Sequence, residues 1–414
     1  LVVSGSVAFQ DNTGGTSGQI HGGGIFIDSD DSNISVTGGT VIMENSTNVN
    51  FKVTSKAPFW NVIMRSTGGT ATEVDLDGGT SGDDDIGDFE TILSPELLVL
   101  NDLTIEDGVI FDHNGFDVEI GSDFIIQANG EYLYDASKQN TTTINGIDDA
   151  TLSLLNRIDG NGEQRFWNLI IEKPANRTVS LASGKADLSG SANNLIRIDG
   201  DALKVLSGTF DNGEHCIRIF ADSLVNYDVL GVYDPADANA DNDFIKLTDQ
   251  PITLVTADTS RFGNVRCNNS TDIVELTSDV FIERFQYRFG RMNLGEHNLT
   301  INALDINLRA DRADWNGCTG CFSVEDMFIT DGLASNGGLS LYVPADGLDP
   351  EDGDATFDFP FGFGTDGLDA FVDTGSGTGN SKYTPASVTL SGVTDDGYIT
   401  IVPVNQALAT LNNA

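Results

Sequence analysis

One short phrase recurs three times along the chain, at intervals of about 100 residues, and it constrains the fold more than any other feature. The copies lie at 59–63, 166–171 and 262–267, and each carries an asparagine ahead of an apolar run: Asn61, Asn168 and Asn264. Self-similarity at a fixed period is typical of stacked repeats, in which each unit packs only on its neighbours. The pattern therefore predicts a stack that offers reach and surface, rather than a fold built around one active site.

A second shared phrase closes each repeat. It is an alternation of apolar and polar residues that ends in Ile120, Ile219 and Ile301 in turn. Alternation with a period of two is typical of a half-buried strand. We therefore expect these three isoleucines to face the core, and we expect the change Ile219→Asp to cost several kcal/mol because it buries a charge without a partner.

Short apolar runs separated by Gly, Asn and Asp extend along most of the chain and indicate an all-β protein. Two-residue hairpin signals are few, so the runs are expected to stack in parallel rather than to fold back on one another. A parallel β-helix with coils of roughly 20–25 residues fits this pattern. We predict such a solenoid, with super-repeats of about 100 residues, over 1–345. For 346–414, where the composition changes, we predict a small β-sandwich-like module. The repeated asparagines are expected at corners of the coils, where Asn tolerates left-handed backbone and bonds to it.

The chain is strongly acidic, with 63 Asp and Glu against 21 Lys and Arg and a formal net charge of −42. Binding to nucleic acid needs clustered cations, so we expect no nucleic-acid partner. There is no run of 18 apolar residues, so we also expect no membrane span. Such a surface is suited to a salty medium, to divalent cations or to cationic partners.

One acidic loop has the spacing of a calcium site. Acidic or amide oxygens occupy every second position, at Asp237, Asn239, Asp241 and Asp243. Oxygen ligands of this kind suit a hard cation, although the Gly and distal Glu of an EF-hand loop are missing. Bound Ca²⁺ and a solvated acidic loop both remain open.

Two of the four cysteines form a Cys-x-x-Cys pair, Cys318 and Cys321. No second pair completes a zinc site, and no βαβ pattern suggests a redox motif. We expect a small local disulfide, with two free thiols as the alternative. Cys216 and Cys267 lie in strand-like alternations, where cysteine acts as a small apolar core residue.

No catalytic motif stands out. The chain has no Gly-x-Ser-x-Gly, P-loop or His-Glu-x-x-His sequence. His113, His215 and His297 recur at the same turn of the second phrase, which is more typical of a structural role than of catalysis. We therefore predict no enzyme activity.

The repeats resemble those of large secreted surface proteins of the Bacteroidetes type. The resemblance rests on an order of phrases, aromatic-x-Asn-Leu-x-Ile, Val-x-Leu, Leu-x-Val-x-x-Gly and an alternation ending in Leu-x-Ile, which is met here at 166–171, 179–181, 203–208 and 213–219. The ending Phe-Pro-Phe-Gly followed by Tyr-Thr-Pro-Ala-Ser-Val is similar to a module that often follows such stacks.

That resemblance implies export by a type IX secretion system and display at the outer cell surface, as an adhesin or a gliding-motility protein. It also implies O-glycosylation at Ser223, within Asp-Ser-Leu. The C-terminal sorting domain of the family is not visible, and the chain begins in mid-pattern, so we expect a processed chain or a piece of a longer protein.

The sequence thus predicts an extracellular structural or adhesive segment that binds surface or glycan ligands and depends on secretion and attachment machinery. Two alternatives stay open: a β-helix that binds or degrades carbohydrate, and a self-associating protein that forms a filament or sheath.

Overall fold

The computed structural model is all-β, as predicted, and no helix occurs in the part of the chain that it describes. The described residues are 6–10, 18–19, 36–52, 58–68, 71–77, 96–155, 163–183, 194–200, 202–213, 215–220, 224–226, 230–233, 245–248, 252–255, 262–306, 328–330, 337–343, 355–359, 361–363, 382–383, 386–390 and 395–402.

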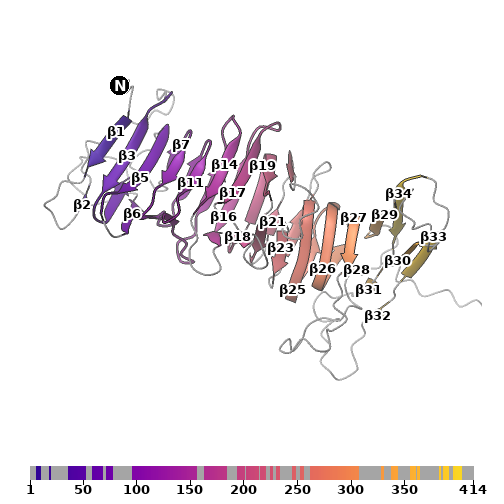
Figure 1. Ribbon diagram of the computed structural model, residues 1–414. Helices are drawn as coiled ribbons and strands as arrows, with labels where there is room; N and C mark the ends of the chain where they lie inside the picture. The colour runs from indigo at the N-terminus through magenta and orange to yellow at the C-terminus, as the bar shows by residue number, and fades with distance from the viewer. Residues whose placement is uncertain are drawn as a thin grey trace, which may run out of the picture. The chain divides into compact units, whose positions relative to one another are not determined.

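The chain divides into two compact units, which are described separately. The first comprises Leu1–Arg218 and Leu230–Asp243, and the second comprises Ile219–Val229 and Phe244–Ala414. The predicted boundary at residue 345 stays a prediction. The two units account for all of the strands labelled in Figure 1, apart from β20 (Cys216–Ile219), which lies at their boundary.

Three rows of parallel strands make up most of the first unit (Figure 1). Row A contains β1 (Ser6–Gln10), β3 (Thr40–Asn45), β5 (Asn61–Ser66), β8 (Leu103–Ile105), β11 (Phe124–Ile126), β14 (Ala150–Leu154) and β17 (Thr178–Ser183). Row B contains β7 (Glu96–Val99), β10 (Asp117–Ile120), β13 (Thr141–Ile144) and β16 (Asn168–Glu172). Row C contains β2 (Gly18–Gln19), β4 (Val49–Lys52), β6 (Thr72–Asp77), β9 (Val109–Asp112) and β12 (Glu131–Tyr132). Rows A and B both end on β19 (Ala202–Asp211), which also pairs with β22 (Leu230–Tyr233), while β15 (Gln164–Phe166) pairs with β18 (Asn194–Ile198).

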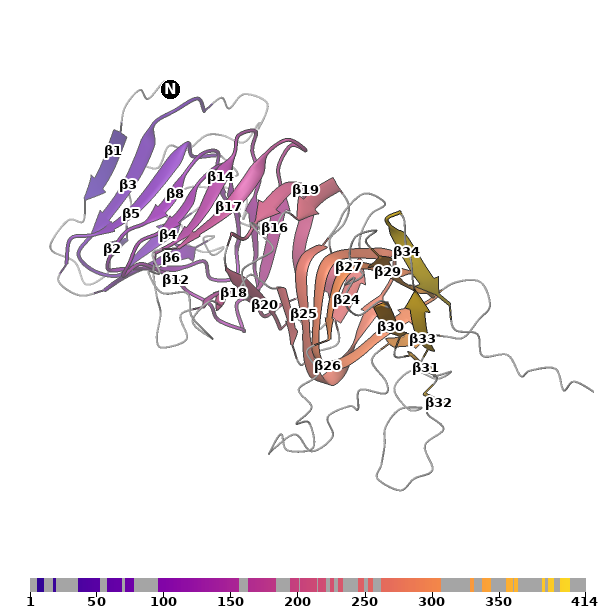
Figure 2. The ribbon, with the colours of Figure 1, turned by 45° about the vertical axis from the view of Figure 1, so that its right-hand side comes forward.

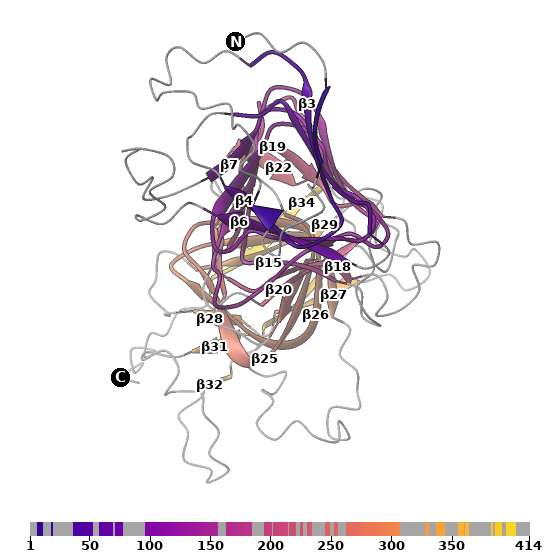
Figure 3. The ribbon, with the colours of Figure 1, turned by 90° about the vertical axis from the view of Figure 1, so that its left-hand side faces the viewer.

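The chain visits these rows in rotation. From β7 it passes to β8 and β9, then to β10, β11 and β12, so that each set of strands lies in register on the one before. Figure 3, which looks along the rows, shows β4 and β6 of row C running across the direction of β3 of row A. Successive layers of one row are therefore separated in sequence by a whole circuit of the chain.

A ladder of aliphatic side chains fills the interior next to row B. Ile120 pairs with Ile144, Ile144 with Ile171, and Ile171 with Val205, and all four are fully buried. Burial of each such side chain contributes about 1.5–3 kcal/mol. Ile120 faces the core as the alternation predicted.

Aromatic rings form the other part of this interior. Tyr132 packs against Phe111, Phe124 and Phe166 at centroid distances of 5.7, 5.3 and 5.7 Å. Its hydroxyl contacts the Thr142 hydroxyl at 2.9 Å and accepts a hydrogen bond from the Asn140 amide at 2.8 Å, so the polar end of the ring is satisfied within the core.

One corner depends on glycine. A Cβ on Gly121 would lie 1.9 Å from the Leu100 carbonyl oxygen, and a Cβ on Gly146 would lie 2.2 Å from the Gly121 carbonyl oxygen. Only a residue without a side chain allows the backbones of successive layers to approach this closely. In the next layer Lys173, which is fully buried, donates to the Gly121 carbonyl oxygen at 2.5 Å.

The second unit continues the parallel pattern with longer strands. β25 (Phe262–Leu276), β26 (Val280–Gly295) and β27 (Leu299–Ile306) pair in parallel, and Figure 2 shows how strongly they curve. Ile219 and Ile301 are fully buried, which confirms that both face the core, and Cys216 and Cys267 are buried among apolar residues. The remaining strands of this unit are β21 (Leu224–Asn226), β23 (Ile245–Thr248), β24 (Ile252–Val255), β28 (Phe328–Thr330), β29 (Leu339–Val343), β30 (Ala355–Phe359), β31 (Phe361–Phe363), β32 (Lys382–Tyr383), β33 (Ala386–Leu390) and β34 (Gly397–Ile401).

Strand direction changes towards the C-terminus. β31 pairs in parallel with β28, but β34 pairs antiparallel with β29, and β30 pairs antiparallel with β33. Strands from beyond residue 345 thus join the same sheet as strands that precede it.

Candidate functional site

The site residues predicted from the sequence lie outside the described part of the chain. They are the calcium ligands Asp237, Asn239, Asp241 and Asp243, the disulfide pair Cys318 and Cys321, and the glycosylation site Ser223. Each stays a prediction.

The repeated asparagines act at corners, as predicted for Asn61 and Asn168. The Asn61 Oδ1 accepts the backbone N–H of Asp102 at 3.2 Å, and the Asn168 Oδ1 accepts that of Ala202 at 2.9 Å. Both acceptors lie at the start of a strand and both donors lie at the same place in the next layer. The repeat in the sequence therefore marks a side chain that fastens one layer to the next.

Aspartates continue this role along row A. Asp102 Oδ1 accepts the N–H of Asp123 at 3.1 Å, and Asp123 Oδ1 accepts that of Thr151 at 2.7 Å. Elsewhere Asp117 binds the N–H of Thr141 at 2.7 Å in the same manner. Ionised acceptors make stronger hydrogen bonds than neutral ones. Part of the acidic charge is therefore structural.

The three recurrent histidines lie at turns. His113 is 2 % exposed, and its Nδ1 accepts the N–H of Gly115 at 3.0 Å. Asn114 and Gly115 have positive φ values of 53° and 84°, and the N–H of Phe116 bonds to the His113 carbonyl oxygen, so the turn is a tight one. Burial lowers the pKa of His113 to about 4, despite the opposing effect of the neighbouring Asp112.

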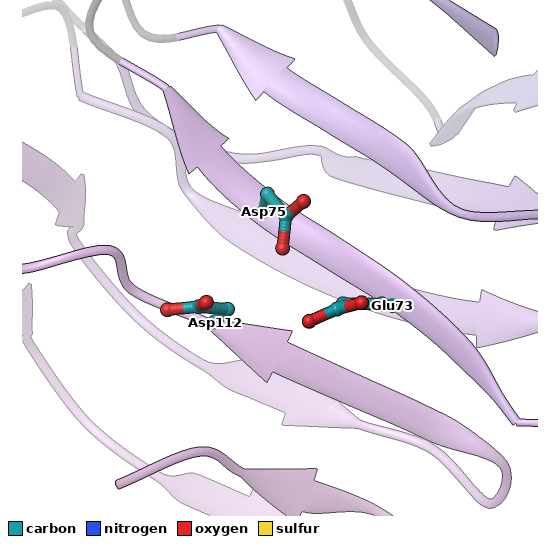
Figure 4. A group of neighbouring side chains, drawn as sticks. All are labelled: Glu73, Asp75 and Asp112. Carbon is teal, nitrogen blue, oxygen red and sulfur yellow. The ribbon is translucent and has the colours of Figure 1, made fainter. Parts of the chain in front are cut away.

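Three carboxylates meet on the outer side of row C (Figure 4). Glu73 and Asp75 lie on β6 and Asp112 ends β9, and the register pairs Asp75 directly with Asp112. One oxygen of each residue lies within 4.8 Å of the others. Such a cluster of hard oxygen ligands could hold a metal ion.

Lys138 already supplies a cation to this acidic cluster. A turn at 135–138, closed by a bond from the Lys138 N–H to the Asp135 carbonyl oxygen, places its Nζ against Asp112 Oδ2. The side chain of Asp112 is 5 % exposed and that of Lys138 is 30 % exposed. The hydrogen bond to Asp112 raises the pKa of Lys138.

The other groups around the acidic cluster are hydrogen-bond donors. Asp112 Oδ1 accepts the N–H of Asn114 at 2.7 Å, and Glu73 Oε2 accepts the amide of Asn48 at 3.2 Å. Sequence reasoning missed this cluster because Asp75 and Asp112 become neighbours only through the register of two strands. The sole local signal was the acidic residues at alternate positions of β6.

A second group of charges lies on β15, β18 and β20. Arg165 pairs in register with Arg197, and both approach Asp199, at 4.0 and 2.5 Å. The Arg165 guanidinium lies 5.7 Å from the centre of the Tyr134 ring, and its side chain is 48 % exposed. Arg218 donates to Glu163 at 2.7 Å. This arginine cluster stands out in a chain with so few cations.

Comparison with protein-family models, with curated proteins and with solved structures found no match. Within the described ranges, no helix is long and apolar enough to cross a membrane.

Proposed function

We propose that the parallel rows belong to a β-helix. The rotation of the chain through rows A, B and C supports this, because each return to a row adds one layer in register with the last. The return distance is near the coil length expected from the sequence: the bond from Asp123 to Asp102 spans 21 residues, and that from Thr141 to Asp117 spans 24.

We further propose that the chain is a non-catalytic structural segment with an adhesive role, displayed outside the cell as part of a larger secreted protein. The observation that carries this proposal is the side-chain fastening between layers, from Asn61 to Asp102, Asp123 and Thr151. Such bonds add to the backbone pairing between layers and stiffen the row. A stiff, highly charged body suits the display of a binding surface in a salty medium.

Electron microscopy and adhesion assays together test this proposal. We expect single, elongated particles, and we expect beads coated with the chain to adhere to surfaces or glycans without releasing reducing ends from acidic polysaccharides. Turnover of a polysaccharide would overturn the non-catalytic role. Helical arrays in the micrographs would favour the filament alternative instead.

The arginine cluster supports a second candidate function, binding of an anionic glycan. An exposed guanidinium beside an aromatic ring offers a charged contact for a carboxylate or sulfate and an apolar face for a sugar ring. Arg165 and Tyr134 have this arrangement. Binding of a uronic-acid polymer that is lost in Arg165→Ala, but kept in Lys204→Ala, would support it.

Calcium is proposed as a structural ion of the same protein, held by Asp237, Asn239, Asp241 and Asp243. The net charge of −42 supports it, since bound divalent cations reduce self-repulsion.

A further inference from the structure

We propose that Lys138 and Asp112 are joined by an amide bond between their side chains, which the folded chain forms by itself. The proposal goes beyond the structural role above and does not depend on it. It rests on four features of one place: a lysine in contact with a buried carboxylate, a backbone donor on that carboxylate, and two further carboxylates beside it.

The two reacting groups are already in contact. Lys138 Nζ lies against Asp112 Oδ2, and Asp112 is held at the end of β9 by its register with Asp75. The turn at 135–138 fixes the backbone from which the lysine extends. Holding two groups in such an arrangement corresponds to effective concentrations of about 10⁵–10⁸ M. That is how an unactivated carboxyl group becomes reactive towards an amine.

Asp112 is placed as the electrophile. Its side chain is 5 % exposed, so water has little access to Cγ. Its Oδ1 accepts the N–H of Asn114 at 2.7 Å. A backbone donor on this oxygen stabilises the negative charge that develops there when Cγ is attacked.

The reaction is a condensation and needs no oxidant or second substrate. Lys138 passes one proton to Asp112, which gives a neutral amine beside a neutral carboxyl group. The nitrogen lone pair attacks Cγ and a C–N bond forms. A second proton then moves from the nitrogen to Oδ2, the C–Oδ2 bond breaks, and Oδ2 leaves as water. Oδ1 becomes the carbonyl oxygen of the amide.

Glu73 and Asp75 are the groups that carry the second proton. Oxygens of both lie within 4.8 Å of an Asp112 oxygen. Carboxylates at this separation also disfavour the ionised form of one another, which helps Asp112 to accept the first proton. A positioned carboxylate that relays a proton contributes about 10²–10⁴-fold to such a step.

The bond would tie the segment after β12 to the end of β9 and close a loop between positions 26 residues apart. Closing a loop stabilises a fold chiefly by restricting the unfolded chain. The cross-linked chain is therefore expected to unfold at a higher temperature than a variant without the bond.

Intact-mass spectrometry of the purified, folded chain tests the proposal. The mass should be lower than that of the sequence by one water molecule, and a digest should contain one peptide that joins Lys138 to Asp112. The variant Lys138→Arg keeps the positive charge and should show the full mass with a similar circular dichroism spectrum. Lys204→Arg is the matched control and should still lose water.

Two further variants test the proton relay. Glu73→Gln and Asp75→Asn keep the shape of the side chains, and combining them should leave most of the protein at full mass. Complete water loss in this double variant would overturn the relay.

Two outcomes would overturn the cross-link itself. One is the full sequence mass in the folded wild-type chain. The other is equal water loss in Lys138→Arg, because the missing water would then come from elsewhere, such as succinimide formation.

Discussion

Replacement of Ile144 by Ala should destabilise the first unit by about 2–5 kcal/mol, the range found when a buried Ile is truncated to Ala. Ile144 is fully buried, and it lies between Ile120 in the layer before and Ile171 in the layer after. The backbone pairing of row B fixes these layers about 4.8 Å apart. They cannot close over the missing atoms, so the cost should fall in the upper part of that range.

Ile147, three residues further on, is the matched control because its side chain is 77 % exposed. Ile147→Ala should change the free energy of unfolding by less than about 0.5 kcal/mol. The measurement is the urea midpoint of both variants, compared at equal slope of the transition. Equal midpoints for Ile144→Ala and Ile147→Ala would refute the assignment of Ile144 to the packed interior.

Three further changes follow from the same structure. Because burial lowers the pKa of His113 to about 4, the unfolded chain binds more protons than the folded chain between about pH 6.5 and 4. Stability should therefore fall as the pH is lowered through this window, by about 3 kcal/mol in total at about 1.4 kcal/mol per unit, and His113→Gln should remove most of this dependence in acid titrations followed by circular dichroism. Asp123→Ala should cost about 1–3 kcal/mol, because it leaves the Thr151 N–H without its charged acceptor, whereas Asp123→Asn should cost less in the same urea assay. If calcium is structural, the thermal midpoint in excess calcium should exceed that in chelator at matched ionic strength; equal midpoints would contradict the calcium prediction.

The sequence predicted those parts of the fold that depend on periodicity. The spacing of Asn61 and Asn168 indicated a stack, and both asparagines fasten one layer to the next. The alternation placed Ile120, Ile219 and Ile301 in the core, where all three are found. These features are local patterns repeated along the chain, and a single sequence contains them in full.

Features that depend on register were not predictable. Asp75 and Asp112 belong to different phrases, and only the pairing of β6 with β9 brings them together. Lys138 reaches Asp112 because the turn at 135–138 folds back over row C. Circuits of unequal length separate the layers, so counting residues along the sequence does not show which side chains become neighbours.

Disulfide trapping on the outer side of row A tests the central claim, which is that successive circuits stack in parallel and in register. Thr104 pairs with Ile125, and Ile125 pairs with Ser153 in the following layer. Paired positions lie within the Cα separation that a disulfide spans, whereas positions two layers apart do not. The account predicts that Thr104→Cys with Ile125→Cys, and Ile125→Cys with Ser153→Cys, form disulfides under mild oxidation, and that Thr104→Cys with Ser153→Cys does not. A disulfide in the third pair without one in the first two would contradict it.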